Sequence, residues 1–460
     1  MNKLVKLERN SVFYRLLLAI TFPIVLQNII ANGVGLINSL MLGQLGSTQI
    51  AAVSLGNQPN FIFMLLTVGL ANGATVLTAQ YWGKSDMTAI RHVVAIVTRF
   101  AFFASLIFAF LVGVFPEAVM RLFTSEPDVI AEGVRYLRIA AFSYPFFGLT
   151  NTILYVLRSV EKVWMSFWIT IVTFVTTICF NWLLIFGKLG FPAMGVVGAA
   201  WANVLARALA FLLVLYYLLV YEKQICFRFK DIFLTDALLT ADFLHHSSPV
   251  ILNEFLWGFA SAAQNMVIGH LGKEGVAAYS IASAVQQMAM VVTYGMVSAS
   301  SVIFGKALGS NQTEKIRPYL TTMKVLSLIV GLFAAGSILL FKNPVIALYQ
   351  IDAGTKALAN QFMIIVAIVA FLQTTYSPIS MGALRAGGDT RFVLFTDISI
   401  MWLLGLPLGI LAAQIWHLPV IWVYVLLKID EPIKLFLFYW RSSGTKWIRN
   451  LTREIDVTLR

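Results

Sequence analysis

Two acidic side chains lie within long apolar stretches of the sequence, where a charged group needs a reason to be present. Glu254 follows the run Val250-Ile251-Leu252, and Asp397 lies in the apolar stretch near residues 392–414. An ionised side chain at the centre of a lipid bilayer costs a few kcal/mol, so a carboxylate there has either a partner or a function. Such a carboxylate can exchange a proton, a sodium ion or an organic cation. We therefore predict that Glu254 and Asp397 form a cation-coupling site, with sodium as one candidate ligand.

Each of these carboxylates also has a structural explanation. Glu254 could cap its helix or form an ion pair near the helix end, because that helix is predicted to begin at about residue 246. Asp397 could join the ion pairs of a charged loop that contains Arg385, Asp389 and Arg391. Asp389 itself lies in a Gly-Gly-Asp-Thr turn, which is typical of a helix N-cap. The sequence leaves these explanations open beside the functional one.

Further polar side chains inside apolar stretches are candidates for a substrate cavity, although hydrogen bonds between helices account for most such groups in membranes. Pro59 interrupts a dense group of amides and frees a backbone carbonyl, so a helix break there could line a cavity. Arg207 needs an acid, a carbonyl or water, and apart from Arg99 it is the only basic residue well inside a predicted span. Trp257, three residues after Glu254, could stack on a cationic substrate or pack as an ordinary tryptophan. The candidate cavity residues are Asn38, Asn57, Gln58, Asn181, Arg207, Asn253, Trp257, Gln264, Gln286, Gln287, Gln373 and Tyr376.

The elements that must position these residues are long apolar helices. The 460 residues are 59% hydrophobic and 12% charged, whereas soluble domains are about 45–50% apolar and about 25% charged. Because a helix needs roughly 20 apolar residues to cross a bilayer, this composition excludes a water-soluble enzyme and a disordered chain. An all-α integral membrane fold is predicted, with twelve transmembrane helices near residues 14–42, 51–80, 93–115, 135–157, 164–187, 194–221, 246–270, 277–306, 320–341, 358–384, 392–414 and 418–440.

The net charge of +12 has its explanation in the loops between these helices. Lys and Arg gather in alternate loops, which is the pattern of cytoplasmic loops in membrane proteins. We therefore expect both termini in the cytoplasm and the chain in the plasma or inner membrane. Lys434 is counted with the basic residues of the C-terminal end. The basic tail from Arg441 onward is expected to be cytoplasmic, facing anionic lipid rather than nucleic acid.

An internal repeat divides the chain into two halves. Shifted by 226 residues, Pro23 falls on Pro249, Gly46 on Gly272, Gly69 on Gly295, Gly83 on Gly309 and Arg91 on Arg317; at a shift of 227, Arg158 falls on Arg385 and Pro192 on Pro419. Two parallel six-helix repeats imply a pseudo-twofold axis along the membrane normal. We predict an N-terminal lobe at 1–221, a linker at 222–245, a C-terminal lobe at 246–441 and a tail at 442–460. The kinks at Pro23 and Pro249 are candidate hinges.

Several of these motifs occur in one known family. The sequence of Pro23, Asn38, the turn Met41-Leu42-Gly43-Gln44-Leu45-Gly46 and Ala51-Ala52-Val53-Ser54 resembles the multidrug and toxic compound extrusion (MATE) transporters, as do its repeat copy and the turn Ala383-Leu384-Arg385-Ala386-Gly387-Gly388-Asp389-Thr390. The resemblance implies two six-helix bundles that export organic, often cationic, compounds in exchange for sodium ions or protons, without a cofactor. Several family members carry acids at the positions of Asn38 and Asn181. A carboxamide cannot release a proton, so proton coupling is not expected in the N-terminal lobe.

The sequence lacks the motifs of other classes of protein. No phosphate-binding Gly-x-x-x-x-Gly-Lys-Ser/Thr loop, His-Glu-x-x-His or Gly-x-Ser-x-Gly is present, and the two cysteines allow neither a disulfide framework nor a four-ligand zinc site. We expect a monomeric transporter of small organic cations in membrane lipid, with no enzymatic activity and no nucleic-acid partner. Two alternatives stay open, a flippase for a lipid-linked precursor and a passive channel or membrane scaffold.

Overall fold

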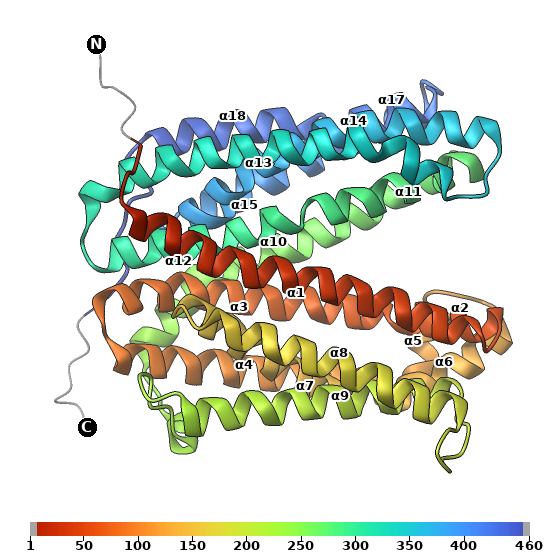
Figure 1. Ribbon diagram of the computed structural model, residues 1–460, viewed down its shortest axis with the longest axis horizontal. Coiled ribbons are helices and arrows are strands. Elements are labelled where there is room, and N and C mark those ends of the chain that lie inside the picture. The colour runs from red at the N-terminus through yellow and green to blue at the C-terminus, as the bar shows by residue number, and fades with distance from the viewer. Residues whose placement is uncertain (1–6, 454–460) are drawn as a thin grey trace. The chain divides into compact units, whose positions relative to one another are not determined.

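The computed structural model describes residues 7–453, and this part of the chain is helical without a β-strand (Figure 1). The first half contains α1 (Ser11–Gly43), α2 (Ser47–Gly56), α3 (Gln58–Lys84), α4 (Met87–Val114), α5 (Pro116–Arg121), α6 (Pro127–Ala140), α7 (Ser143–Ser159), α8 (Val163–Phe186), α9 (Val196–Tyr216), η1 (Tyr217–Tyr221) and η2 (Phe229–Phe233). The second half contains α10 (Ala237–Gly269), α11 (Lys273–Ala289), α12 (Val291–Gly309), α13 (Thr313–Ala347), α14 (Ala353–Ser377), η3 (Pro378–Leu384), α15 (Thr390–Ile400), η4 (Met401–Gly405), α16 (Leu406–Gln414), α17 (Val420–Leu427) and α18 (Asp430–Ser443).

These helices account for the twelve predicted spans. Among the described residues, nine helices are long and apolar enough to cross a membrane, and the pair α6 and α7, bent by 55°, makes a tenth. The other two predicted spans are α10 and the pair α17 and α18. Both carry charged side chains in their middle, at Glu254 and at Asp430, Glu431 and Lys434. The fold is therefore the predicted all-α integral membrane fold, with the least apolar spans where the ionisable groups lie.

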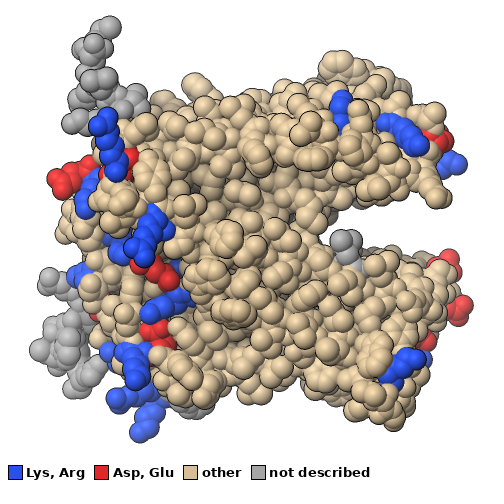
Figure 2. Space-filling view, in the orientation of Figure 1, with Lys and Arg blue, Asp and Glu red and all other residues tan. Residues whose placement is uncertain are grey.

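Charged side chains avoid the middle of the helices on the visible face of the protein. In Figure 2 the Lys, Arg, Asp and Glu side chains in view gather near the ends of the helices, and other residues form the surface between. Large apolar side chains such as Phe103, Ile107 and Phe110 of α4 are well exposed. An exposed apolar belt is what a helix needs in order to face lipid.

One helix begins earlier than the sequence predicts. The start of the seventh span was expected at about residue 246, but α10 begins at Ala237. Asp236 explains the difference, because its Oδ1 accepts a hydrogen bond from Leu239 N at 2.9 Å, as an N-cap side chain does. Glu254 therefore lies deep in α10 and not near the start of a helix.

The described residues form two compact units. The first, called unit 1, comprises Met1–Val25, Ala79–Ser85 and Leu252–Arg460; the second, called unit 2, comprises Leu26–Thr78 and Asp86–Ile251. Three unit boundaries lie within long helices: two of them fall two residues after a predicted hinge proline, at Val25 in α1 and at Ile251 in α10, and the third lies at Thr78 in α3. Both helices run through their proline without a break.

Each unit has its own apolar core. In unit 2 the long helices α8 and α9 run side by side (Figure 1), and the core of this unit centres on Phe63, Tyr136 and Tyr144. In unit 1, α13 and α14 run side by side, and the core centres on Phe362 and Tyr424, whose ring centroids are 5.1 Å apart. Such aromatic pairs add to the free energy gained from burying apolar area.

The turns repeat as the sequence does. Gly46 (φ 124°) and Gly272 (φ 97°) both precede a short helix, and Ser85 (φ 61°) and Asn311 (φ 56°) both precede a long one. In each pair the two residues are 226 positions apart. Left-handed backbone is uncommon outside glycine, so its recurrence at related positions supports the parallel duplication of the fold.

Glycine allows α3 and α12 to approach closely within unit 1. A Cβ atom on Gly83 would collide with the backbone of Lys306, and one on Gly309 would collide with the backbone of Gln80. A shift of 226 residues relates Gly83 to Gly309 and Gln80 to Lys306, so the two contacts are equivalent in the repeat. At the centre of this crossing, Gly305 packs on Ala79, its own repeat counterpart. The pseudo-twofold axis therefore passes through the contact of Ala79 with Gly305.

The described part of the C-terminal tail packs onto unit 1. Trp447 is fully buried, and its ring lies edge-on to Phe304 with 6.0 Å between centroids. Gln80 Nε2 donates to Arg449 O at 3.1 Å, and Gln80 Oε1 accepts from Leu451 N at 2.7 Å. An aromatic side chain and backbone hydrogen bonds thus hold residues 444–453 against the helices, and the expectation that the tail faces anionic lipid stays a prediction.

Candidate functional site

The two predicted coupling carboxylates lie in one polar network of unit 1. Glu254 Oε1 in α10 accepts a hydrogen bond from Arg385 Nη1 at 3.0 Å. The other terminal nitrogen of Arg385 donates to Asn253 Oδ1 at 2.5 Å, and Asn253 Nδ2 donates to Asp397 Oδ2 in α15 at 3.2 Å. Arg385 and Asn253 thus connect the two carboxylates, and all four side chains are largely buried.

A buried lysine extends the network from Asp397 to α18. Lys434 Nζ lies 2.9 Å from Asp397 Oδ1 and 2.7 Å from Asp430 Oδ2, and all three side chains are at most 4% exposed. Asp430 and Lys434 are one helical turn apart, which brings them to the same face of α18. Asp397 therefore pairs with α18 and not with the loop charges considered from the sequence. Asp389 of that loop pairs with Arg441 instead, at 2.6 Å.

Glu431 differs from the other acids of the network in having neutral partners. Its Oε1 accepts from Gln373 Nε2 at 2.7 Å, and its Oε2 accepts from Tyr376 OH at 2.8 Å. Gln286 Nε2 donates to Gln373 Oε1 at 3.2 Å. Within residues 7–453 no ion pair includes Glu431, which is 3% exposed. Three of the predicted cavity residues, Gln286, Gln373 and Tyr376, thus meet at a carboxylate that the sequence analysis did not name.

The acids of this network outnumber its cations. Glu254, Asp397, Asp430 and Glu431 are four carboxylates, whereas Arg385 and Lys434 are the two cations that pair with them. Lys428 is half-buried on the same side and donates to Gln264 Oε1 at 2.7 Å. Uncompensated charge inside a protein is costly and is relieved by protonation or by a bound counter-ion. The network is therefore chemically suited to take up a proton or another cation.

Four members of the network escaped the sequence analysis. Arg385 lies directly after η3, between two spans as expected, but its side chain is buried and paired with Glu254. Lys434, which was counted with the tail, lies inside α18, so the view of Arg99 and Arg207 as the only basic residues well inside the spans is wrong. Asp430 and Glu431 were not considered. The available signal was an Asp-Glu pair with a lysine one turn later, inside an otherwise apolar stretch near residues 418–440.

Unit 2 repeats this hydrogen-bond pattern without the carboxylates. Gln27 Oε1 accepts from Arg158 Nη2 at 2.7 Å, and Gln27 Nε2 donates to Thr170 Oγ1 at 2.8 Å. The repeat relates these three residues to the network of unit 1, at Asn253, Arg385 and Asp397. Arginine and carboxamide are common to both halves, and the acids belong to the second half alone.

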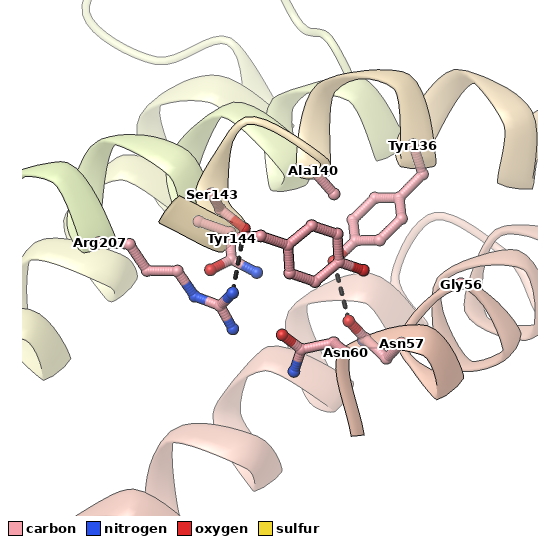
Figure 3. Close-up of a pocket in the computed structure, with 9 residues that line it drawn as sticks. Gly56, Asn57, Asn60, Tyr136, Ala140, Ser143, Tyr144 and Arg207 are labelled. Carbon is pink, nitrogen blue, oxygen red and sulfur yellow. Dashed lines mark hydrogen bonds between the residues drawn. The ribbon is translucent and has the colours of Figure 1, made fainter. Parts of the chain in front are cut away.

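The other predicted residues of unit 2 fall into two places. Asn181 Nδ2 donates to Asn38 Oδ1 at 2.7 Å, so the two carboxamides satisfy each other. Asn57 lies at the break between α2 and α3, and it lines a pocket with Arg207 (Figure 3). Arg207 Nη1 donates to Ser143 Oγ at 3.0 Å, so the partner of this arginine is a hydroxyl group.

Four predicted cavity residues are exposed: Asn57, which lines the pocket, and Gln58, Trp257 and Gln287, for which no pocket contact is seen among the described residues. The part of the last three in a cavity stays a prediction, as does the stacking of Trp257 on a substrate. Gln264 is buried and holds Lys428, and its Nε2 donates to Leu427 O at 3.4 Å. Within residues 7–453 no group of three or more His, Cys, Asp or Glu side chains is placed to hold a metal ion.

Twelve spans in two related bundles, with ionisable groups held between the helices of one unit, define a multi-spanning membrane transporter. Comparison with known proteins agrees. The model of the MatE family matches residues 23–183 and, again, residues 249–411. The chain belongs to the MatE family, which confirms the resemblance seen in the sequence. The two matched segments coincide with the two repeats.

Individual relatives extend over most of the chain. A probable multidrug resistance protein of Bacillus subtilis, YoeA, is 23% identical and covers 91% of this chain and 90% of its own. A probable multidrug resistance protein of Rhizobium meliloti, NorM, is 26% identical, with 82% and 83% covered. Among solved structures, a MOP superfamily transporter from Pyrococcus furiosus has a TM-score of 0.85 at 17% identity over 98% of this chain and 100% of its own. The bent form of the Vibrio cholerae MATE transporter VcmN has a TM-score of 0.85 at 18% identity, with 96% and 98% covered.

Proposed function

We propose that the protein is a secondary active antiporter that exports organic, cationic amphipathic compounds in exchange for sodium ions or protons. Membership of the MatE family and relatives named as multidrug resistance proteins support this function. The observation that carries it within the structure is the excess of carboxylates in the interior of unit 1. An exchanger needs groups that can be neutralised by either of two competing cations, and these carboxylates are such groups.

Glu254 and Asp397 are the proposed coupling residues. Glu254 has the cationic partner Arg385, and Asp397 has the cationic partner Lys434 and the neutral partner Asn253. A cation that binds at Glu254 competes with Arg385, which keeps its second hydrogen bond to Asn253. One carboxylate is not neutralised by ion and substrate together, so their occupancies oppose each other and transport becomes coupled. Glu431 belongs to the same network and adds a carboxylate without a cationic partner.

The proposed hinges are Pro23 and Pro249. In each repeat the compact unit changes two residues after the proline, so bending at these positions, together with a change in α3 between Thr78 and Ala79, would move the two units. A flippase for a lipid-linked precursor is the alternative function. Arg158 and Arg207, which have neutral partners inside unit 2, favour it, because guanidinium groups bind phosphates well.

The test is transport by the purified protein in closed vesicles. A fluorescent organic cation is offered under a proton gradient and then under a sodium gradient, for the unchanged protein, for Glu254→Gln and for Glu274→Gln. Glu274 is an exposed acid at the start of α11 and serves as the matched control. We expect flux that depends on one gradient, is lost in Glu254→Gln and is kept in Glu274→Gln.

Two results would overturn parts of this proposal. Normal coupled flux in Glu254→Gln would remove Glu254 from the coupling site and leave the antiporter function standing. An unchanged protein that moves no organic cation under either gradient, but moves a fluorescent lipid pyrophosphate between leaflets, would replace the antiporter with the flippase.

A further inference from the structure

Arg207 is a cation in the interior of unit 2, and no carboxylate among the described residues forms an ion pair with it. Its Nη1 donates to Ser143 Oγ at 3.0 Å, and its guanidinium carbon lies 4.4 Å from the centroid of the Phe147 ring. A guanidinium group carries five N–H donors, and Ser143 is the one hydrogen-bond acceptor that Arg207 reaches within residues 7–453. A charged group inside a protein is stable only when it is paired. Arg207 therefore has donor capacity and positive charge left for a ligand.

The head group of Arg207 faces a pocket of neutral donors. Figure 3 shows the pocket between α3, α6, α7 and α9, with Asn60 and Tyr144 beside the guanidinium group. Tyr136 OH donates to Asn57 Oδ1 at 3.0 Å, which leaves the amide group of Asn57 as the end that can donate. Asn60 Oδ1 is buried without a hydrogen-bond partner among the described residues. Rotation of its carboxamide by half a turn would present NH2 to the same place.

The residues that line the pocket include no Asp or Glu. The helices at Ser47–Lys84, Met87–Val114, Ser143–Ser159, Val163–Phe186 and Val196–Tyr221 contain no Asp or Glu. The α6 helix, which also lines the pocket, carries two acids outside it: Asp128 is exposed, and Glu132 pairs with Arg135 at 3.0 Å. Arg158, the other interior arginine of this unit, likewise has Gln27 and the Tyr155 ring as partners. The interior of unit 2 is therefore positive, whereas the polar network of unit 1 has an excess of carboxylates.

We propose that Arg207 is the centre of an anion-binding site in unit 2, with hydroxyl and amide donors from Ser143, Tyr144, Asn57 and Asn60. The cavity volume of ≈ 10 Å³ is about what one water molecule requires. The site takes a small monovalent anion such as chloride, or the carboxylate group of an organic ligand. Because both are larger than a water molecule, the side chains around the pocket must move outward to admit either one. For the organic ligand the inference rests on the proposed function, because the anionic group would belong to the exported compound. For a free anion it stands without transport.

Binding is tested on the full-length protein in detergent, where transport plays no part. Sodium chloride and sodium acetate are titrated against sodium isethionate, a sulfonate too bulky for the pocket, at constant sodium and ionic strength. The readouts are the melting temperature and the heat of binding. We expect a saturable response to chloride, acetate or both, and a loss of affinity of about 10- to 100-fold in Arg207→Gln, as the removal of charge-assisted hydrogen bonds produces.

Three variants make the result decisive. Arg99→Gln is the matched control, because Arg99 is also an arginine inside a span of unit 2 but donates to Leu234 O at 2.8 Å, away from the pocket. Arg207→Lys keeps the charge and should retain part of the binding, and Tyr144→Phe removes one hydroxyl group with little change in volume. Without anion, Arg207→Gln should melt no lower than the unchanged protein, because it removes an interior charge that lacks a counter-charge.

The arms of the experiment separate the two sources of the anion. A response to chloride alone identifies a free halide as the ligand. The substrate carboxylate is identified as the ligand by two results together. Acetate gives a response, and Arg207→Gln transports a zwitterionic fluorescent compound more weakly than its methyl ester. The proposal is overturned if neither anion gives a saturable response in the unchanged protein, or if Arg207→Gln responds as the unchanged protein does. Failure of the proposed function shows separately, as absent flux of the ester in the unchanged protein.

Discussion

At the scale of single residues, the charged groups of unit 1 are defined by their partners: Glu254 pairs with Arg385, and Asp397 pairs with Lys434. Glu254 and Asp397 were recognised from the sequence because an acid in an apolar stretch is conspicuous. Their partners were not, because Arg385 follows directly after a predicted span and Lys434 was counted with the basic tail, and basic residues are ordinary in such places in membrane proteins. Helix packing brings these ends into the interior of unit 1, at 3% and 2% exposure. Sequence spacing within one helix cannot show contacts made by another helix.

Lys434 should be the residue of this network with the largest effect on stability. It lies between Asp397 and Asp430, and its replacement by Met leaves two buried carboxylates without a counter-charge. Removal of one partner from a buried ion pair costs about 3–5 kcal/mol. We expect a clearly lower melting temperature in detergent for Lys434→Met than for Lys428→Met, since Lys428 is half-buried and bonds to a neutral amide. Equal melting temperatures for the two variants would show that the ion pairs of Lys434 contribute no extra stability.

Glu431 should affect the response to protons and leave stability nearly unchanged. Its partners Gln373 and Tyr376 are neutral, and Gln at position 431 keeps an oxygen that accepts a hydrogen bond. We expect Glu431→Gln to flatten the dependence of the initial transport rate on pH, while binding of a labelled substrate at a single pH persists. The comparison is with Glu274→Gln, which should follow the pH profile of the unchanged protein. A pH profile identical in all three proteins would exclude Glu431 from coupling.

At the scale of elements, the twelve helices were predictable and their internal breaks were not. Apolar stretches of about 20 residues are a strong signal, whereas the break of α2 and α3 at Asn57 and the bend of 55° between α6 and α7 depend on tertiary packing. The start of α10 at Ala237 depends on the cap by Asp236, a local signal that lies in a polar segment and was taken as part of a linker. The cavity residues that do meet, such as Gln286, Gln373 and Tyr376, come from different helices.

The crossing of α3 and α12 should tolerate no side chain at its glycines. Gly309 lies against the backbone carbonyl of Gln80, which cannot move aside as a flexible side chain would. Overpacking typically costs about 1–3 kcal/mol and sometimes more. We expect Gly309→Ala to lower the melting temperature and the yield of folded protein. Gly336→Ala, in an exposed position of α13 with open space around it, should leave the melting temperature equal or higher. An unchanged melting temperature and yield in Gly309→Ala would contradict the close approach of α3 and α12.

At the scale of the whole molecule, the two halves share a fold and differ in charge. The hydrogen bonds from Gln27 to Arg158 and Thr170 recur in the second half with carboxylates added. The sequence repeat predicted the shared fold, since prolines, glycines and arginines keep one register. It also predicted that the acids belong to one half. It could not predict that the acids would exceed their cations, because that balance depends on which basic residues fold inward.

The expected orientation in the membrane can be checked with a natural cysteine. Cys226 is exposed in the segment between η1 and η2, which the charge pattern assigns to the cytoplasm. In a Cys179→Ser protein, an impermeant thiol reagent should label Cys226 in inverted vesicles and not in right-side-out vesicles. Labelling in the opposite set of vesicles would reverse the predicted topology of both termini.

The contact of Ala79 with Gly305 bears on the evolutionary origin of the chain. In a dimer of two identical six-helix proteins, the residue at this position would meet its own copy across the twofold axis. Such a residue must be small enough to face itself, and alanine and glycine both satisfy that condition. Once two such copies are joined in one chain, each can change alone, which allows one half to carry acids where the other has neutral residues. The crossing at the axis is thus the part of the molecule in which the ancestral dimer is still visible.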